Sequence, residues 1–147
     1  MRRMAREKGP NLNDVHEANA LFYRALEGLD LAAMDGLWLH QPWVRCIHPG
    51  WDVLVGWEAV RGSWQRIFES TRWIRVTPTD VQVQVFGEVG MAACAENITS
   101  TRDGDVGVAV AQATNLFLRT QEGWRMIHHH ASPVPVHVTQ PFSGTVQ

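Results

Sequence analysis

Residues 106–131 read VGVAVAQATNLFLRTQEGWRMIHHHA, and this stretch decides the fold class. From Val106 to Leu118, apolar residues fill much of both alternating sets of positions, which predicts a long strand with two apolar faces. The sequence Gln121-Glu122-Gly123 marks a turn, and residues 124–131 predict a strand that returns beside the first. An antiparallel sheet usually keeps one face in water. The second apolar face therefore predicts a homodimer that forms through the sheet.

The part of the chain before this hairpin divides into helices followed by strands. Apolar residues recur every three or four positions over residues 18–29, 31–38 and 56–70, which predicts three helices. Short apolar runs and period-two alternation predict strands at residues 43–47, 81–85 and 91–101. This segregation predicts an α+β fold in which three N-terminal helices pack on one face of a curved antiparallel sheet.

Length and composition narrow the class of protein. The 147 residues suit a single domain, which we expect at 13–135, between a disordered basic tail at 1–12 and a C-terminal tail at 136–147. The net charge of −2 gives no general attraction to nucleic acid, and no apolar run is long enough to span a membrane. Two cysteines are too few for a disulfide framework, which predicts reduced thiols and a cytoplasmic location.

Three motifs and the predicted helix pair together resemble the SnoaL-like branch of the nuclear transport factor 2-like superfamily. The motifs are HPGW at 48–51, GWEAV at 56–60 and GWRMIHHHASP at 123–133. The resemblance implies a cone-shaped, cystatin-like α+β barrel with an open mouth, an internal pocket and a dimer formed through the sheet. The superfamily includes ketosteroid isomerase, scytalone dehydratase and polyketide cyclases, but also the association domain of a calmodulin-dependent kinase. The function must therefore be argued from the residues of the site.

Ketosteroid isomerase gives a mixed comparison when its site is carried over residue by residue. The resemblance places Phe22 where that family has its oxyanion tyrosine, with Tyr23 one step off the face. It places His48, before Pro49, near the general-base aspartate, and Thr114 near the second oxyanion acid. Two of the three roles thus lack their hydroxyl or acid donor, and steroid isomerisation by that mechanism is not expected.

His48 is the residue that we expect to act as general base. A histidine changes charge near neutral pH and can take a proton from a substrate within hydrogen-bond reach. Glu96 lies mid-strand among small apolar residues, where burial would raise its pKa. It is then either a functional acid or the ion-pair partner of an arginine such as Arg45 or Arg75.

His128 and His130 share one face of the last predicted strand, because side chains two residues apart point the same way. We expect this face to line the cone, with His130 as a third catalytic residue that positions or polarises the substrate. His129 is expected to face away. The alternative is that these side chains only satisfy one another in a buried hydrogen-bond network.

The expected ligand is a small apolar organic molecule, because six of the seven tryptophans fall between Trp38 and Trp73, near the predicted mouth. The predicted substrate-binding residues are Phe22, Trp38, Trp51, Trp64, Thr114 and His128.

Three functions remain open from the sequence. The leading hypothesis is a cofactor-free acid–base isomerase, dehydratase or cyclase that binds no metal. The second is a non-catalytic ligand-binding or dimeric association module. The third is a metal-dependent enzyme that uses His48, His128 and His130, since imidazoles suit Zn²⁺ or non-haem Fe²⁺.

Overall fold

The computed structural model describes residues 12–135. The predicted tails at 1–12 and 136–147 lie outside this range, apart from Leu12. Three helices come first in the chain: α1 (Leu12–Glu27), α2 (Leu31–Leu37) and α3 (Trp57–Ser70). Asp30 caps α2, because its carboxylate accepts a hydrogen bond from the Ala33 amide at 3.0 Å. These bounds agree with the three helices that the apolar periodicity predicts.

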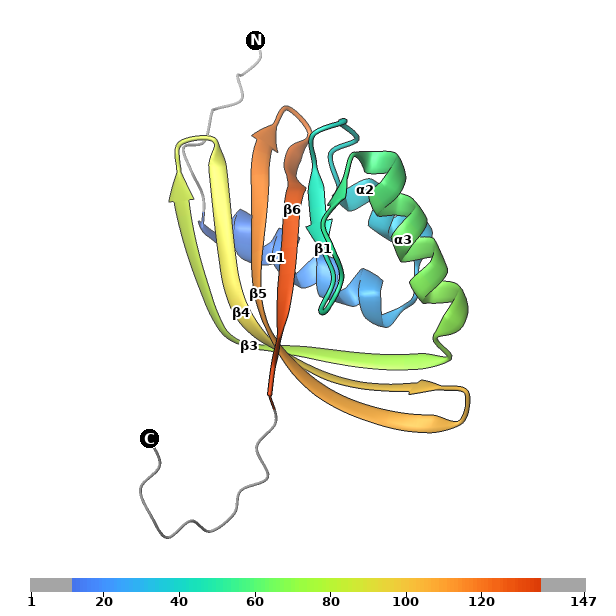
Figure 1. Ribbon diagram of the computed structural model, residues 1–147. Coiled ribbons are helices and arrows are strands. Elements are labelled where there is room, and N and C mark those ends of the chain that lie inside the picture. Colours follow the sequence, from blue (N-terminus) through green and yellow to red (C-terminus); the bar gives the residue numbers. More distant parts are fainter. Residues whose placement is uncertain (1–11, 136–147) are drawn as a thin grey trace, which may run out of the picture.

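Six strands form one curved sheet in the order β2-β1-β6-β5-β4-β3. Their bounds are β1 (Arg45–Ile47), β2 (Leu54–Val55), β3 (Trp73–Phe86), β4 (Val89–Arg102), β5 (Asp105–Thr120) and β6 (Gly123–Val134). All neighbours are antiparallel except β1 and β6, which run parallel. The long strands curve around the helices, which all lie on the concave side (Figure 1). The predicted α+β cone is confirmed.

The strand β3 begins at Trp73, well before the alternating stretch 81–85 that predicts it. A bulge interrupts the alternation between the two halves of β3. Thr79 pairs with Ala95 and Gln82 with Ala93, so two residues of β3 oppose one of β4. Asp80 lies in this bulge with φ 53°, and the alternation therefore changes phase there. The two-residue strand β2 carries no periodic signal and was not predicted.

A second bulge, in β6, reverses the predicted orientation of the histidines. Phe117 pairs with Met126 and Leu116 with His128, which leaves Ile127 as an extra residue. Even-numbered side chains of β6 therefore point inward up to Met126, and odd-numbered side chains point inward after the bulge. His129 is buried at 2% exposure and points inward, whereas His130 is exposed. The expectation that His128 and His130 line the cone is wrong for this reason.

Small residues on the inner face of the sheet let α1 lie close to it. Gly90 has no side chain, and a Cβ there would come within 2.6 Å of Val15 Cγ2 of α1. Ala92, Cys94 and Glu96 follow on the same face of β4 and are buried. The helix α1 thus crosses β4 at close range, and its next inward residues lie beside Cys94 and Glu96.

Candidate functional site

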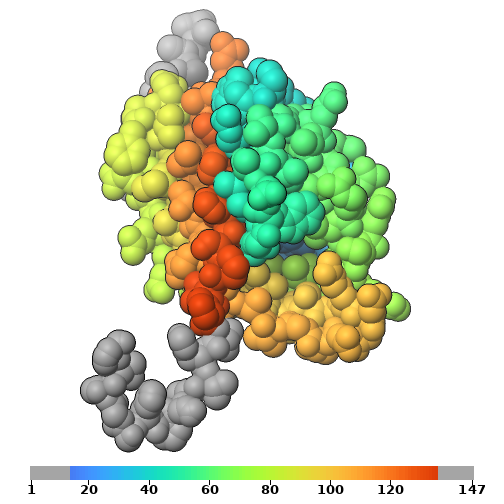
Figure 2. Space-filling model, in the orientation of Figure 1, coloured from blue at the N-terminus to red at the C-terminus, as the bar shows by residue number. Residues whose placement is uncertain are grey.

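A cavity of about 350 Å³ opens on the concave side of the sheet. Figure 2 shows its opening between the loop after β1, α3 and the β4–β5 hairpin, with α1 visible at the bottom. The walls are mostly apolar: Leu26, Pro49, Trp51, Trp64, Ile67, Ile74, Val76 and Ile98. The polar lining is His48, Thr71, Glu96, Ser100, Arg102 and His129. An apolar pocket with a few convergent polar groups is typical of a site for a small organic molecule.

Glu96 is the buried carboxyl of this cavity, with 3% of its surface exposed. Tyr23 of α1 donates its hydroxyl to Glu96 Oε2 at 2.6 Å. Burial raises the pKa of Glu96 to about 7, although the Tyr23 hydrogen bond acts in the opposite direction. The predicted arginine partners, Arg45 and Arg75, are exposed. Glu96 is therefore a buried carboxyl with a raised pKa, held by a tyrosine.

Asn115 of β5 is fully buried and fixes the directions of the hydrogen bonds around it. Its amide nitrogen donates to Asn19 Oδ1 at 2.8 Å and to Tyr23 Oη at 3.1 Å. Both amide hydrogens are used, so its oxygen accepts from His129 Nδ1 at 2.6 Å. His129 therefore carries its proton on Nδ1 and a lone pair on Nε2.

The charge state of His129 follows from its surroundings. Burial, together with the nearby His48, His128 and His130, holds the pKa of His129 well below its usual range. The ring is neutral at physiological pH. It offers the ligand an acceptor rather than a positive charge.

His48 follows β1 and is also buried, at 3% exposure. The Ser63 hydroxyl donates to the Val60 carbonyl at 2.7 Å, so its oxygen accepts from His48 Nε2 at 2.8 Å. The lone pair of His48 is therefore on Nδ1. Burial, and to a smaller extent the charge of Arg66, lowers the pKa of His48 to about 4. His48 is neutral at pH 7 and can act as a base.

The structure brings only part of the predicted site together. His48, Glu96, Trp51 and Trp64 line the cavity, and Trp51 is 41% exposed beside His48. Phe22 and Trp38 are buried in the core, where the Phe22 ring lies 4.9 Å from that of His129.

Three other predicted residues face outward. Thr114 and His130 are exposed and His128 is half-buried on the convex face of the sheet. The ring centroids of His128 and His130 lie 6.3 Å apart there. Since these two do not converge with His48, the histidine set of the metalloenzyme hypothesis is not assembled. Within residues 12–135, no three His, Cys, Asp or Glu side chains are grouped to hold a metal ion.

Sequence reasoning missed the residues that organise the inner end of the cavity: Asn19, Tyr23, Asn115 and His129. Tyr23 was placed off the inward face of α1, but it is 3% exposed and bonded to Glu96. The hydroxyl donor that seemed lost from the first helix is thus present, one residue after Phe22. The available signal was the spacing of Asn19 and Tyr23, four residues apart on one helix face.

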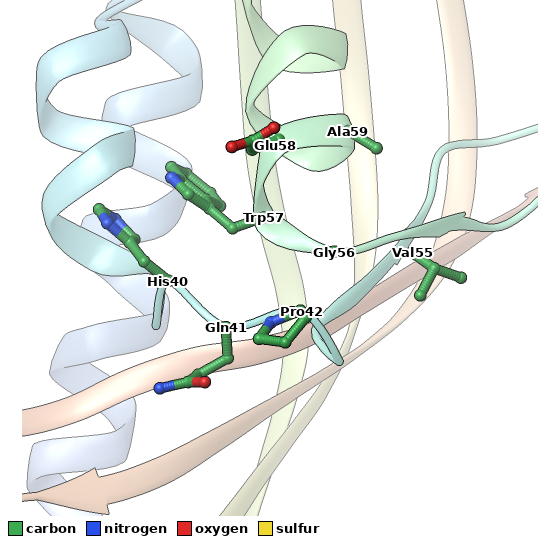
Figure 3. Close-up of a pocket in the computed structure, with 8 residues that line it drawn as sticks. All are labelled: His40, Gln41, Pro42, Val55, Gly56, Trp57, Glu58 and Ala59. Carbon is green, nitrogen blue, oxygen red and sulfur yellow. The ribbon is translucent and has the colours of Figure 1, made fainter.

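A larger surface recess of about 530 Å³ lies outside the cone, between the end of α2 and the start of α3 (Figure 3). The His40 ring stacks on Trp57 there, with centroids 4.4 Å apart, and His40 Nε2 bonds the Asp35 carbonyl. The other titratable group of this recess, Glu58, is exposed. Because it holds no buried acid or base, the recess is the weaker candidate for chemistry.

The model of the SnoaL-like domain matches residues 15–137, which include Tyr23, His48, Glu96 and His129. The chain belongs to the SnoaL-like domain family. A solved structure from Streptomyces avermitilis, described as a candidate dehydratase of the NTF2-like family, is 38% identical. The match covers 85% of this chain and 96% of that one, with a TM-score of 0.81.

Other relatives of this SnoaL-like chain carry different descriptions. A structure from Thiobacillus denitrificans, described as a candidate association domain of calcium/calmodulin-dependent protein kinase type II, is 30% identical. The match covers 82% of this chain and 94% of the relative's chain, with a TM-score of 0.73. F-box protein SKIP8 of Arabidopsis thaliana is 26% identical over 80% of this chain. The chain spans only 48% of that curated relative's length.

None of the helices within residues 12–135 is long and apolar enough to cross a membrane.

The raised pKa of Glu96 predicts how its replacement changes stability with pH. The folded protein holds the Glu96 proton more tightly than the unfolded chain does, so stability present below pH 4.5 is lost as the pH rises through about 7. Glu96→Gln removes this loss. The free energy of unfolding of Glu96→Gln, relative to that of the natural protein, should therefore rise by on the order of 3 kcal/mol between acid and alkaline pH.

Urea unfolding at several pH values measures this difference. Glu122→Gln, in the exposed turn before β6, is the matched control and should show no such trend. A constant gap between Glu96→Gln and the natural protein would contradict the assignment of Glu96 as a buried acid.

Proposed function

We propose that this protein eliminates water from a small, largely apolar alcohol by acid–base catalysis without a cofactor. The observation that carries the proposal is Glu96, a carboxyl buried in a cavity, held by Tyr23 and with its pKa raised to about 7. A group whose pKa lies near the ambient pH can both give and take a proton readily. The neutral imidazole of His48 lines the same cavity and supplies a base.

The proton transfers of the proposed reaction balance within these two residues. His48 takes a proton from the carbon next to the carbinol carbon, and the electrons of that C–H bond form the double bond. The carbon–oxygen bond breaks, and protonated Glu96 gives its proton to the departing hydroxyl, which leaves as water. Transfer of the proton from His48 to Glu96 restores the starting state.

The surroundings of the pair support this reaction. The apolar walls limit competing water, and Tyr23 donates to one oxygen of Glu96, which leaves the other for the substrate. The 38% identical relative described as a candidate dehydratase supports elimination in particular. Isomerisation and cyclisation would use the same two proton transfers, and they are the reactions to examine next.

Activity should depend on pH in a defined way. His48 must be neutral, which requires a pH above about 4, and Glu96 must be protonated, which requires a pH below about 7. We expect kcat/KM to be greatest between these limits and to fall about tenfold per pH unit outside them. Mass spectrometry of a panel of small alcohols incubated with the protein would detect products that have lost one water.

Variants identify the residues responsible. Glu96→Gln and His48→Gln should each lower kcat/KM by about a hundredfold or more while leaving the fold intact. His130→Gln, on the convex face, is the control and should keep full activity. Full activity in Glu96→Gln would refute the proposed mechanism.

We also propose that two copies of the chain associate through the convex face of the sheet. Val106 and Val108 of β5 are 68% and 72% exposed, and Trp73 of β3 is 45% exposed. Trp73 and Val106 both pair with Thr101 across β4, so their side chains share one row. Large exposed apolar patches mark association surfaces. The 30% identical relative described as a candidate association domain supports self-association. A purely associating module would show this surface and no turnover.

Sedimentation measures this association directly. We expect the natural protein to sediment as a dimer and Val108→Asp to shift it toward monomer, because the new charge would be buried in the interface. Val53→Asp is the matched control, since Val53 is 49% exposed in the segment before β2 and should leave the dimer intact. A monomeric natural protein would contradict the proposal.

A further inference from the structure

The imidazole donors at the inner end of the cavity are already committed to the protein. His48 Nε2–H donates a hydrogen bond to the Ser63 hydroxyl, and His129 Nδ1–H donates one to the Asn115 amide oxygen. The Tyr23 hydroxyl donates to Glu96. All of these bonds are buried, so diverting one to a ligand would leave a buried polar atom without a partner.

Two further donors near the cavity are also withheld from a ligand. The Thr71 hydroxyl donates to the Ile67 carbonyl at 2.7 Å. The indole nitrogen of Trp64 is closed off from solvent and has no hydrogen-bond partner within residues 12–135. The remaining side-chain donors of the polar lining, Ser100 and Arg102, lie near the end of β4.

The groups left for a ligand are acceptors. They are the lone pair on His129 Nε2 and the second carboxyl oxygen of Glu96, whereas the lone pair on His48 Nδ1 faces the Cys46 thiol, with Sγ at 3.9 Å. At this inner end of the cavity, away from Ser100 and Arg102, only the protonated form of Glu96 adds a donor. A ligand hydroxyl suits both states, because it can donate to a lone pair and can accept from protonated Glu96. A ketone oxygen only accepts, and it meets lone pairs whenever Glu96 is ionised.

We infer that the inner end of the cavity recognises a ligand hydroxyl and discriminates against the ketone of the same shape. Sites that bond a substrate hydroxyl reject analogues that cannot make the same hydrogen bonds. The inference deepens the proposed function, because it names the substrate class of the same cavity. It concerns binding alone and needs no turnover.

The discrimination should grow with pH, because ionisation of Glu96 removes the one donor at the inner end of the cavity. The titratable groups near Glu96 are Tyr23 of α1, Cys46 of β1, His48, Cys94 of β4 and His129 of β6, and the positively charged Arg102 of β4 lines the same cavity. Burial keeps the two histidines neutral and the tyrosine and cysteines protonated across this range. Glu96 is therefore the group that changes charge near pH 7.

The test compares 2-tetralol with 2-tetralone, two bicyclic molecules that differ only in hydroxyl against carbonyl. Binding is followed through the indole N–H signals of Trp51 and Trp64 in ¹H–¹⁵N NMR spectra. At about pH 8.5 the alcohol should bind about tenfold or more tightly than the ketone, and the ratio should shrink at about pH 5.

Glu96→Gln separates this inference from a general preference for alcohols. Its amide adds a permanent N–H donor, so the ketone should gain affinity and the pH dependence should disappear. Glu122→Gln is the control and should retain the preference of the natural protein.

Ketone binding as tight as alcohol binding in the natural protein at about pH 8.5 would overturn the inference. An unchanged ratio in Glu96→Gln, or binding of neither probe, would overturn it as well. A protein that prefers the alcohol but turns no alcohol over would instead refute the proposed catalysis and leave the inference standing.

Discussion

The hydrogen bonds of Asn115 determine where the hydrogen atoms lie at the inner end of the cavity. Because both of its amide hydrogens are donated, to Asn19 and Tyr23, its oxygen can only accept from His129. Tyr23 accepts one of these hydrogen bonds and donates its own to Glu96 at 2.6 Å. One fully buried side chain thus sets the tautomer of a histidine and the direction of a tyrosine proton.

This arrangement requires α1 to lie close to the sheet. The absence of a side chain at Gly90 allows Val15 to approach β4, and Asn19 and Tyr23, about one and two helical turns later, reach the strand residues. The helix thereby supplies the Tyr23 hydroxyl to the buried Glu96 carboxyl and the Asn19 side chain to Asn115. Without the Tyr23 hydrogen bond, the burial of Glu96 would be more costly.

The sequence predicts the elements of the fold because apolar periodicity is a local property. It also singles out Glu96 and His48, because a carboxyl among small apolar strand residues and a histidine before Pro-Gly are local features of the sequence. It fails for His129, because the bulge at Ile127 changes which residues of β6 face inward, and nothing in WRMIHHHA marks an extra residue. Tyr23 was misplaced for a related reason. The helix α1 packs over a wide arc, so Phe22 and Tyr23 are both buried and a single inward stripe does not describe it.

The protonation state of Glu96 governs both the proposed proton transfers and the ligand preference. Carbon-13 NMR of protein labelled at glutamate carboxyls follows it directly, with Glu96→Gln to assign the signal. We expect the Glu96 carboxyl to titrate with a pKa near 7, because the effect of its burial outweighs the opposite effect of the Tyr23 hydrogen bond. Titration at its ordinary pKa of 4.5 would show a solvated carboxylate and would contradict the catalytic role assigned to Glu96.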